Sequence, residues 1–287
     1  MEIMASERLK YLLTIPSFLF LSFFTLLPLL YTFYLSFTST KIVSGSIQQF
    51  LTFSNYGRIL QDDLFIHSLK VTLVFVLTGV FLEFVLGLGL GLLAHAVTRV
   101  RFLFSSVMAI PVILPYVSVG MIWRLLLNTE FGLVNSILRM IGLSKMTWLQ
   151  DMNLAFVSLI LCEVWHWTPF VFLILFAGIE ALPKEPFQAA IVDGASRLQM
   201  FRYLTLPLLK PIIIVALLFR TMAAFRAFDA IYVLTHGGPG NATQVTSLYI
   251  YKQAFQIFDL GYASTGGLFL ALVVVLFSLF YLRLQGT

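Results

Sequence analysis

The sequence predicts an all-α integral membrane protein with six transmembrane helices and one ordered cytoplasmic loop. Of its 287 residues, 60% are hydrophobic and only 11% are charged, and its mean hydropathy is +0.96. Soluble domains carry about 25% charged residues, and disordered chains contain far fewer apolar side chains than this one. A bilayer core about 30 Å thick requires about 20 apolar residues of helix, and six stretches reach that length. We expect a single transmembrane domain over residues 1–287.

The expected spans are residues 11–37, 69–97, 102–127, 154–179, 209–234 and 263–284. The first span follows basic residues, as a signal peptide does, but it is too long for the apolar part of one. It also contains Pro16 and Pro28 and lacks a small-residue cleavage site, so we interpret it as a retained anchor. Three glycines of the second span are expected to allow close helix packing: Gly87, Gly89 and Gly91.

Basic residues orient the spans, because Lys and Arg concentrate in cytoplasmic loops. A cytoplasmic amino terminus gives the following inner set: Arg8, Lys10, Arg99, Arg101, Lys184, Arg197, Arg202, Lys210 and Arg283. The outer loops then hold Lys41, Arg58, Lys70, Arg139, Lys145 and Lys252, although they are longer in total. We therefore expect a multi-pass protein of the cell membrane with both termini in the cytoplasm. The basic pI near 9.3 follows from these flanking residues and does not indicate nucleic-acid binding.

The connections differ in length on the two sides of the membrane. The outer connections 38–68, 128–153 and 235–262 are long enough for short helices, whereas the inner link 98–101 is minimal. On the inner side, only the cytoplasmic segment 180–210 is long, which indicates a docking surface.

The cytoplasmic segment predicts a helix, a turn and a second helix at the membrane surface. Pro183 and Pro186 suit the start of a short helix, because a proline there gives up an amide that has no helical partner. Asp193-Gly194 is typical of a turn, and a second helix is expected from Ser196 to Tyr203. The pattern alone leaves open an interfacial hairpin that has no partner.

The order of residues in this segment resembles a known family, the permease subunits of ABC importers that depend on a binding protein. The resemblance is carried by Gln188-Ala189-Ala190, Asp193-Gly194-Ala195, Phe201 and Leu204-x-Leu206-Pro207. It extends from about residue 16 to 284 and includes Trp165-x-x-Thr168-Pro169-Phe170 and Phe228-Asp229 followed by Gly237-Gly238-Pro239. The last string is similar to the first of the two permeases in carbohydrate importers of the maltose and glycerol-3-phosphate type.

This resemblance implies a type I ABC importer permease with several partners. They are a second homologous permease, an ATPase homodimer that binds ATP and Mg, an extracytoplasmic solute-binding protein and a sugar. The resemblance also implies that Gln188, Ala189, Ala190, Asp193, Gly194, Ala195 and Phe201 belong to the helices that couple the permease to the ATPase. The family usually has an acid where this chain has Gln188, and Gln can form a hydrogen bond there but no ion pair.

Ionisable residues at the centre of a span are costly and point to a partner or a water-filled cavity. In the fourth span, Glu163, His166, Trp167 and Phe170 follow helical spacing and share one face. They are consistent either with packing between helices, with Glu163 satisfied by a neighbour, or with a sugar site. In the second case an aromatic ring lies against the pyranose while Glu and His bond hydroxyls. The family resemblance places solute contacts at the positions of His166, Trp167 and Phe170, which favours the site.

The fifth span contains Arg220, Arg226 and Asp229. Arg226 and Asp229 are three residues apart and can form a structural pair within one helix. The stretch of this helix that faces solute in the family corresponds to residues 223–227, so we assign Phe225 and Arg226 to the substrate pathway. Arg220 and Asp229 are interpreted as structural.

The sequence contains no catalytic or metal-binding constellation. Cys162 is the single cysteine, and His67, His95 and His236 fit no metal-ligand spacing. No Gly-x-x-x-x-Gly-Lys-Ser/Thr string occurs, so ATP hydrolysis is expected from a separate subunit, and we expect neither an enzyme nor a cofactor in this chain. The alternatives are an importer of glycerol-3-phosphate or a polyol-like solute, an ion-coupled secondary carrier, and a membrane enzyme of lipid or glycan metabolism.

Overall fold

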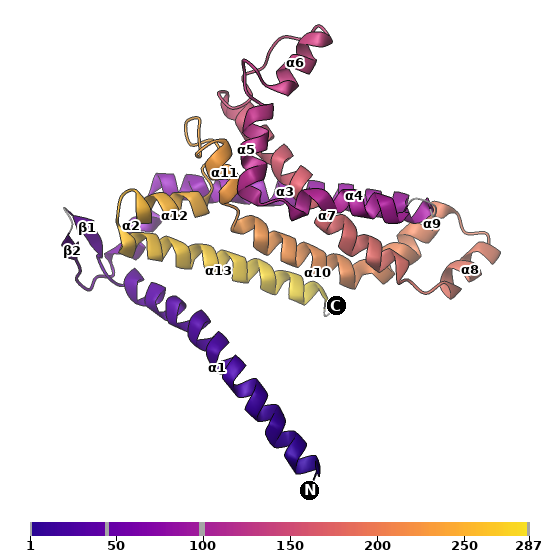
Figure 1. The fold of residues 1–287 in the computed structure, drawn as a ribbon, viewed down its shortest axis with the longest axis horizontal. Coiled ribbons are helices and arrows are strands. Elements are labelled where there is room, and N and C mark those ends of the chain that lie inside the picture. Colours follow the sequence, from indigo (N-terminus) through magenta and orange to yellow (C-terminus); the bar gives the residue numbers. More distant parts are fainter. Residues whose placement is uncertain (1, 44–45, 98–100, 286–287) are drawn as a thin grey trace. The chain divides into compact units, whose positions relative to one another are not determined.

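The structure is a computed structural model that describes residues 2–43, 46–97 and 101–285. Its elements are α1 (Glu2–Ser36), β1 (Lys41–Val43), β2 (Ser46–Gln48), α2 (Ser54–Leu60), α3 (Asp63–Ala96), α4 (Arg101–Ile113), α5 (Tyr116–Leu126), α6 (Leu133–Met140), α7 (Met152–Glu180), α8 (Glu185–Val192), α9 (Arg197–Met200), the π-helical turn η1 (Phe201–Thr205), α10 (Leu206–Phe225), α11 (Asp229–Leu234), α12 (Thr246–Phe255) and α13 (Leu260–Gln285) (Figure 1). Helices make up almost all of this list, which confirms the predicted class.

Five of these helices are long and apolar enough to cross a membrane by themselves. Four of them, α1, α3, α7 and α13, correspond to the first, second, fourth and sixth expected spans. The fifth is the continuous helical run Arg197–Phe225, which enters its span from the cytoplasmic segment. A bent pair of helices supplies the remaining span if the two count as one. The protein is therefore a multi-pass membrane protein.

The third expected span, 102–127, is not one straight helix. It consists of α4 and α5, which meet at an angle of 96°. Pro115 precedes α5 with φ −57° and ψ 132°, which is an extended conformation. Proline donates no backbone hydrogen bond and disfavours a helical conformation of the preceding residue, here Leu114. The break follows from this proline, and it makes Tyr116 the first residue of α5.

The fifth expected span, 209–234, is also interrupted. Helix α10 ends at Phe225, and α11 begins at Asp229. Arg226 lies at the end of α10, where its backbone amide bonds the carbonyl of Ala223 in a tightened last turn. The sequence does not reveal this break, because the intervening residues 226–228 contain no proline or glycine.

The chain divides into two compact units. The first is Met1–Phe65 with Ile250–Phe269. In this unit β1 and β2 form an antiparallel hairpin, which the sequence did not predict. Asp259 lies 3.2 Å from Lys41 Nζ and 3.5 Å from Arg58 Nη1. These contacts join residues about 200 positions apart, so no local pattern in the sequence predicts them.

The second unit, Ile66–Tyr249 with Leu270–Thr287, contains an apolar core made by α3, α7 and α10. Its buried residues are Leu88, Val171, Leu175, Ile179, Leu209 and Ala216. A Cβ atom at Gly87 would lie 3.0 Å from the Phe172 backbone nitrogen, and one at Gly91 would lie 3.3 Å from Ile179. The expected close packing is therefore confirmed at Gly87 and Gly91, whereas Gly89 has no neighbour within 4 Å.

The expectation of short helices in the outer connections is confirmed by α2, α6 and α12. In the second unit, buried hydroxyls fix α12 to α3. Thr72 Oγ1 accepts a hydrogen bond from the Thr246 backbone amide at 2.8 Å, and it lies 3.0 Å from Thr246 Oγ1. Such fully partnered hydroxyls are what a buried polar contact between helices requires.

Candidate functional site

The cytoplasmic segment folds as the sequence predicts, into a helix, a turn and a helix. Helix α8 has Pro186 in its first turn, and the chain reverses at Gly194, whose φ of +76° suits glycine. Helix α9 begins with a capping box in which Ser196 Oγ accepts from the Gln199 amide while Gln199 Oε1 accepts from the Ser196 amide. The helical path then continues through η1 into α10.

The predicted coupling residues occupy two different environments. Gln188, Ala189, Asp193 and Gly194 are exposed, and Ala190 and Ala195 are partly exposed. Phe201 instead packs against the apolar core of α3, α7 and α10. Among these seven residues, Phe201 therefore anchors the segment, while the others lie on or next to its surface.

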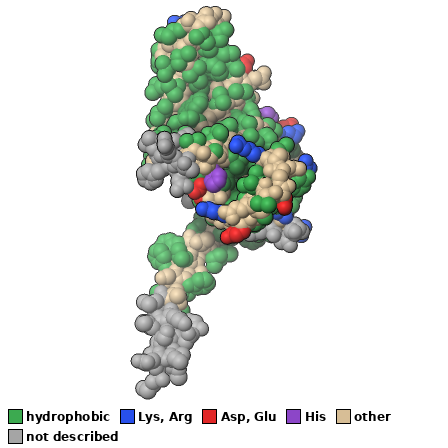
Figure 2. All heavy atoms as spheres, turned by 90° about the vertical axis from the view of Figure 1, so that its right-hand side faces the viewer, with side chains coloured by type: hydrophobic (Ala, Val, Ile, Leu, Met, Phe, Trp, Pro, Cys, Tyr) green, Lys and Arg blue, Asp and Glu red, His purple; other side chains and the backbone are tan. Residues whose placement is uncertain are grey.

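The α8–α9 end of the second unit carries charged side chains next to exposed apolar ones. Figure 2 views the molecule from this end and shows basic and acidic side chains gathered on it. Val192 is 87% exposed and Leu198 is 74% exposed. Apolar residues this exposed, rimmed by charges, are typical of a surface that binds another protein.

The predicted stripe on α7 is partly buried. Glu163 and His166 are buried, whereas Trp167 and Phe170 are half-buried. The rings form a connected group: Tyr116 stacks on His166 at 4.7 Å between centroids, and Trp167 lies edge-on to His166 at 4.8 Å. Nδ1 of His166 is buried and has no hydrogen-bond partner among the described residues.

An ion cluster joins this stripe to two other membrane-spanning helices. Arg220 Nε lies 2.5 Å from Glu83 Oε2, and Arg220 Nη2 donates to Glu83 Oε1 at 2.9 Å. The same Nη2 also donates to Glu163, which in addition accepts a hydrogen bond from Tyr116. None of the three charged residues is more than 1% exposed. We call Arg220, Glu83 and Glu163 the ion cluster.

The ion cluster bears on two expectations from the sequence. Arg220 has the structural surroundings that were expected of it. In this conformation Glu163 is held by Arg220 and Tyr116, as the packing interpretation of the stripe required. Sequence reasoning missed Glu83 and Tyr116. Glu83 had a usable signal, because it is an ionisable residue inside an apolar span.

Among the described residues, no hydrogen bond, ion pair or ring contact joins Phe225 or Arg226 to the α7 stripe. Phe225 is buried against Phe277 of α13, with ring centroids 5.1 Å apart. Arg226 is exposed, and its Nε donates to the Met222 carbonyl of its own helix at 3.3 Å. Nor does Arg226 form the expected pair with Asp229 within the described part of the chain, because α10 ends before Asp229 begins α11.

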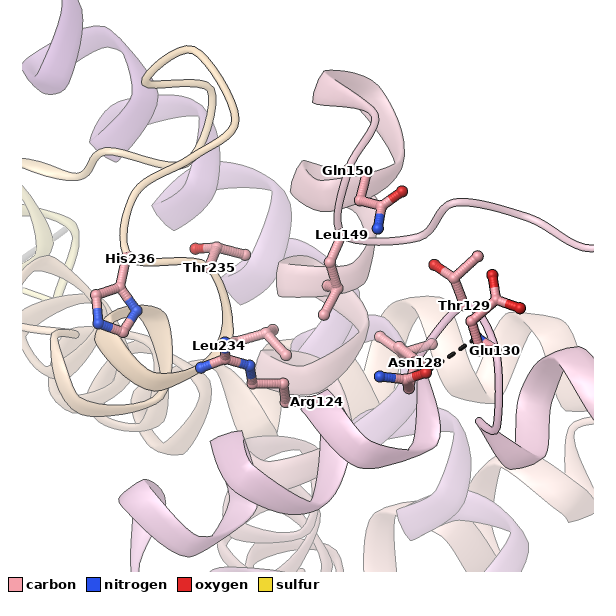
Figure 3. A pocket seen from close by; sticks show the side chains of 10 residues that line it. Arg124, Asn128, Thr129, Glu130, Leu149, Gln150, Leu234, Thr235 and His236 are labelled. Atoms are coloured by element: carbon pink, nitrogen blue, oxygen red, sulfur yellow. Dashed lines mark hydrogen bonds between the residues drawn. The ribbon is translucent and has the colours of Figure 1, made fainter.

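A polar pocket of about 570 Å³ lies where α5, the segment before α7 and the end of α11 come together (Figure 3). It is lined by Arg124, Leu127, Asn128, Thr129, Glu130, Leu149, Gln150, Leu234, Thr235 and His236. Arg124 Nη1 donates to the Val233 carbonyl at 3.0 Å, and Asn128 Oδ1 accepts from the Glu130 amide at 2.9 Å. The pocket was not predicted from the sequence, because its lining residues come from three separate segments of the chain.

Within residues 2–43, 46–97 and 101–285, no group of three or more His, Cys, Asp or Glu side chains is placed to hold a metal ion. Cys162 is a buried free thiol. The arrangement offers aromatic and polar side chains along α7 and an exposed helical hairpin formed by α8 and α9.

Comparisons with known proteins agree on one family. The family described as "Binding-protein-dependent transport system inner membrane component" matches residues 83–286. The trehalose/maltose transport system permease protein MalF of Thermococcus litoralis is 36% identical over 276 residues, which cover 96% of this chain and 93% of the relative. The sulfoquinovosyl glycerol transport system permease protein SmoG of Agrobacterium fabrum is 35% identical, covering 96% of this chain and 88% of its own.

The fold is likewise that of a solved importer. A bacterial ABC transporter involved in the import of the acidic polysaccharide alginate contains a chain that superposes with a TM-score of 0.84. The superposition covers 99% of this chain and 97% of that one, at 23% sequence identity.

Proposed function

Because this chain belongs to the family of binding-protein-dependent transport system inner membrane components, we propose that it is a permease subunit of an ATP-driven importer for a sugar. The solute we propose is a di- or oligosaccharide such as maltose or trehalose. The observation that carries the proposal is the 36% identity, over 96% of the chain, with a permease named for trehalose and maltose transport.

We propose that the permease lies in the cell membrane with both termini in the cytoplasm. The support is the distribution of Lys and Arg, which favours the side of the α8–α9 segment as the inner one. This orientation puts α2, α6 and α12 outside, where an extracytoplasmic binding protein would deliver the solute.

The α8–α9 segment is the proposed docking surface for an ATPase homodimer, which would bind ATP and Mg. Its exposed apolar residues next to charged ones suit a protein partner. Phe201 fixes the segment to the core of α3, α7 and α10, so a displacement of the segment would be transmitted to these helices. A second homologous permease would complete the pathway.

For the solute contact we propose the α7 stripe. Trp167 and Phe170 are half-buried rings, and an aromatic ring offers a flat apolar surface to a pyranose. Nδ1 of His166 is available for a hydroxyl. Glu163 reaches solute only if the ion cluster opens, and Phe225 and Arg226 stay predictions for the part of the pathway near the α10–α11 break.

A polyol-like or anionic solute such as glycerol-3-phosphate is the second candidate. It is favoured by the 35% identity to a permease named for sulfoquinovosyl glycerol transport. The two candidates differ in charge, so a panel that contains neutral disaccharides and anionic glycerol derivatives separates them.

The test is copurification followed by reconstitution. The tagged chain is expected to bring with it a second permease and an ATPase. Liposomes containing this complex and the binding protein should hydrolyse ATP faster with one solute class, and liposomes lacking the binding protein serve as the control. A chain that purifies alone and transports without ATP would overturn the proposal in favour of an ion-coupled carrier.

A further inference from the structure

The ion cluster contacts the α7 stripe at Trp167 as well as at Glu163. The Arg220 guanidinium carbon lies 4.8 Å from the centroid of the Trp167 ring. This is cation–π geometry, and such contacts are strongest where water is excluded, as it is around Arg220. One guanidinium therefore holds both a carboxylate and an aromatic ring of the same helix.

The two glutamates determine where the guanidinium lies. Glu83 engages two nitrogens of Arg220, Nε and Nη2, and Glu163 engages Nη2 a second time. Neither Nε nor Nη1 has a hydrogen-bond partner among the described residues, so the Nε side of the guanidinium is held by the ion pair with Glu83 Oε2. A planar guanidinium fixed along one edge has little rotational freedom, so the face it presents to Trp167 is also fixed.

The ring contacts of the indole among the described residues are all edge-on. Trp167 lies edge-on to His166, at 4.8 Å between centroids, to Phe170, at 6.0 Å, and to Tyr116, at 6.2 Å. It is half-buried, so neighbouring side chains enclose only part of it. The rings that lie edge-on to the indole limit its lateral movement, whereas the Arg220 guanidinium lies over its face.

We propose that Arg220 is a positioning residue for solute recognition, which holds the indole of Trp167 in the orientation that a sugar ring contacts. Glu83 and Glu163 act through Arg220 by fixing its guanidinium. The inference rests on the proposed function for its transport consequence, but the contact between Arg220 and Trp167 is tested without any solute.

The first measurement is spectroscopic and needs no transport. In the full complex, Trp123, Trp148 and Trp165 are replaced by Phe, and the emission of Trp167 is taken as the difference from the same complex that also carries Trp167→Phe. Arg220→Lys keeps the charge but loses the planar fork. We expect the Trp167 emission to shift and its quenching by acrylamide to rise at least about twofold, as for a ring over which the cation is no longer held in place. Arg139→Met is the control, because Arg139 is exposed and its one hydrogen bond among the described residues goes to Ser136 Oγ, at 3.3 Å.

The second measurement is uptake of maltose and trehalose by proteoliposomes that contain saturating binding protein. Arg220→Lys should lower the maximal rate about tenfold for both sugars, within the range of a desolvated cation–π contact. If the complex does not assemble, Arg220→Met with Glu83→Gln and Glu163→Gln removes all three charges together. This triple variant should assemble and still transport about tenfold more slowly, because Trp167 lacks its cation.

The outcomes are distinct. Arg220→Lys or the triple variant with wild-type emission of Trp167 and wild-type uptake overturns the inference and leaves the ion cluster a structural device. A wild-type complex that takes up neither sugar overturns the proposed function instead. In that case the emission of Trp167 still decides whether Arg220 positions it.

Discussion

Helix α8 buries none of its residues, whereas no charged side chain of the ion cluster is more than 1% exposed. Both regions belong to the second compact unit. The α8–α9 segment owes its shape to local devices, namely a proline in the first turn, a glycine with positive φ and a capping box. The ion cluster joins residues 83, 163 and 220, and it exists only because three helices pack together.

The two regions should therefore respond differently to amino-acid substitution. A substitution in the α8–α9 segment should alter how this surface binds a partner and leave the fold intact. A change in the ion cluster should alter the fold first, because a buried charge without its partner is strongly unfavourable. The four expected results below run from the largest effect to the smallest.

Arg220→Met is expected to have the largest effect. It leaves Glu83 and Glu163 facing each other without a cation, and breaking a buried ion pair costs about 3–5 kcal/mol. Thermal denaturation of the purified complex should show the loss as a lower midpoint and a lower yield. Arg139→Met, at an exposed position of α6, should stay within about 0.5 kcal/mol of wild type. Equal stability of the two variants would contradict the claim that the ion cluster stabilises the fold.

Gly194→Asp should abolish uptake while the complex still assembles. A Cβ atom there meets nothing within 4 Å, so the strain comes from φ +76° alone, about 1–2 kcal/mol. The added charge then lies beside Asp193 on the proposed docking surface. Gly142 is the matched control, with φ +81° and equally open space, and Gly142→Asp should transport. Normal uptake by Gly194→Asp would count heavily against a coupling role.

Trp167→Ala should lower transport about tenfold without changing basal ATP hydrolysis, because it removes an aromatic surface of the proposed solute contact. Trp165→Ala is the control on the same helix, since Trp165 is 42% exposed and packs edge-on to Trp123 at 6.2 Å. Uptake kinetics of the reconstituted complex provide the measurement. Unchanged kinetics would show that Trp167 only packs against neighbouring helices and does not contact the solute.

Ser196→Ala should have the smallest effect. It removes the side-chain acceptor of the α9 capping box, which is worth about 1 kcal/mol, so the Gln199 amide should exchange its hydrogen about fivefold faster. Uptake should change little. Ser196→Thr retains the hydroxyl and should exchange as wild type does, and equal exchange in both variants would show that the cap does not hold α9.

Several elements were predictable because their determinants are adjacent in sequence. The α8–turn–α9 segment was predicted from its prolines, from Asp193-Gly194 and from Ser196. The spans corresponding to α1, α3, α7 and α13 followed from length and hydropathy. The α4–α5 break was not predicted but could have been, because Pro115 lies inside the expected span. The end of α10 at Phe225 was not, because no proline or glycine marks it.

The candidate site divides in the same way. The α7 stripe was found because residues 163, 166, 167 and 170 recur at helical spacing on one helix. Its partners Glu83, Tyr116 and Arg220 come from other helices, and the sequence set no distance between them. Only the fold showed that Glu163 is already engaged and that Arg220 also reaches Trp167.

By itself the sequence determined that this chain crosses a membrane several times, which face of α7 is polar and aromatic, and where the cytoplasmic segment turns. These properties depend on the hydrophobic effect and on backbone preferences, and both act over a few neighbouring residues. The tertiary structure decided which carboxylates share Arg220, that Phe201 anchors the exposed segment, and which three segments form the polar pocket. Those depend on helix packing, which sets distances between residues that the chain itself leaves free.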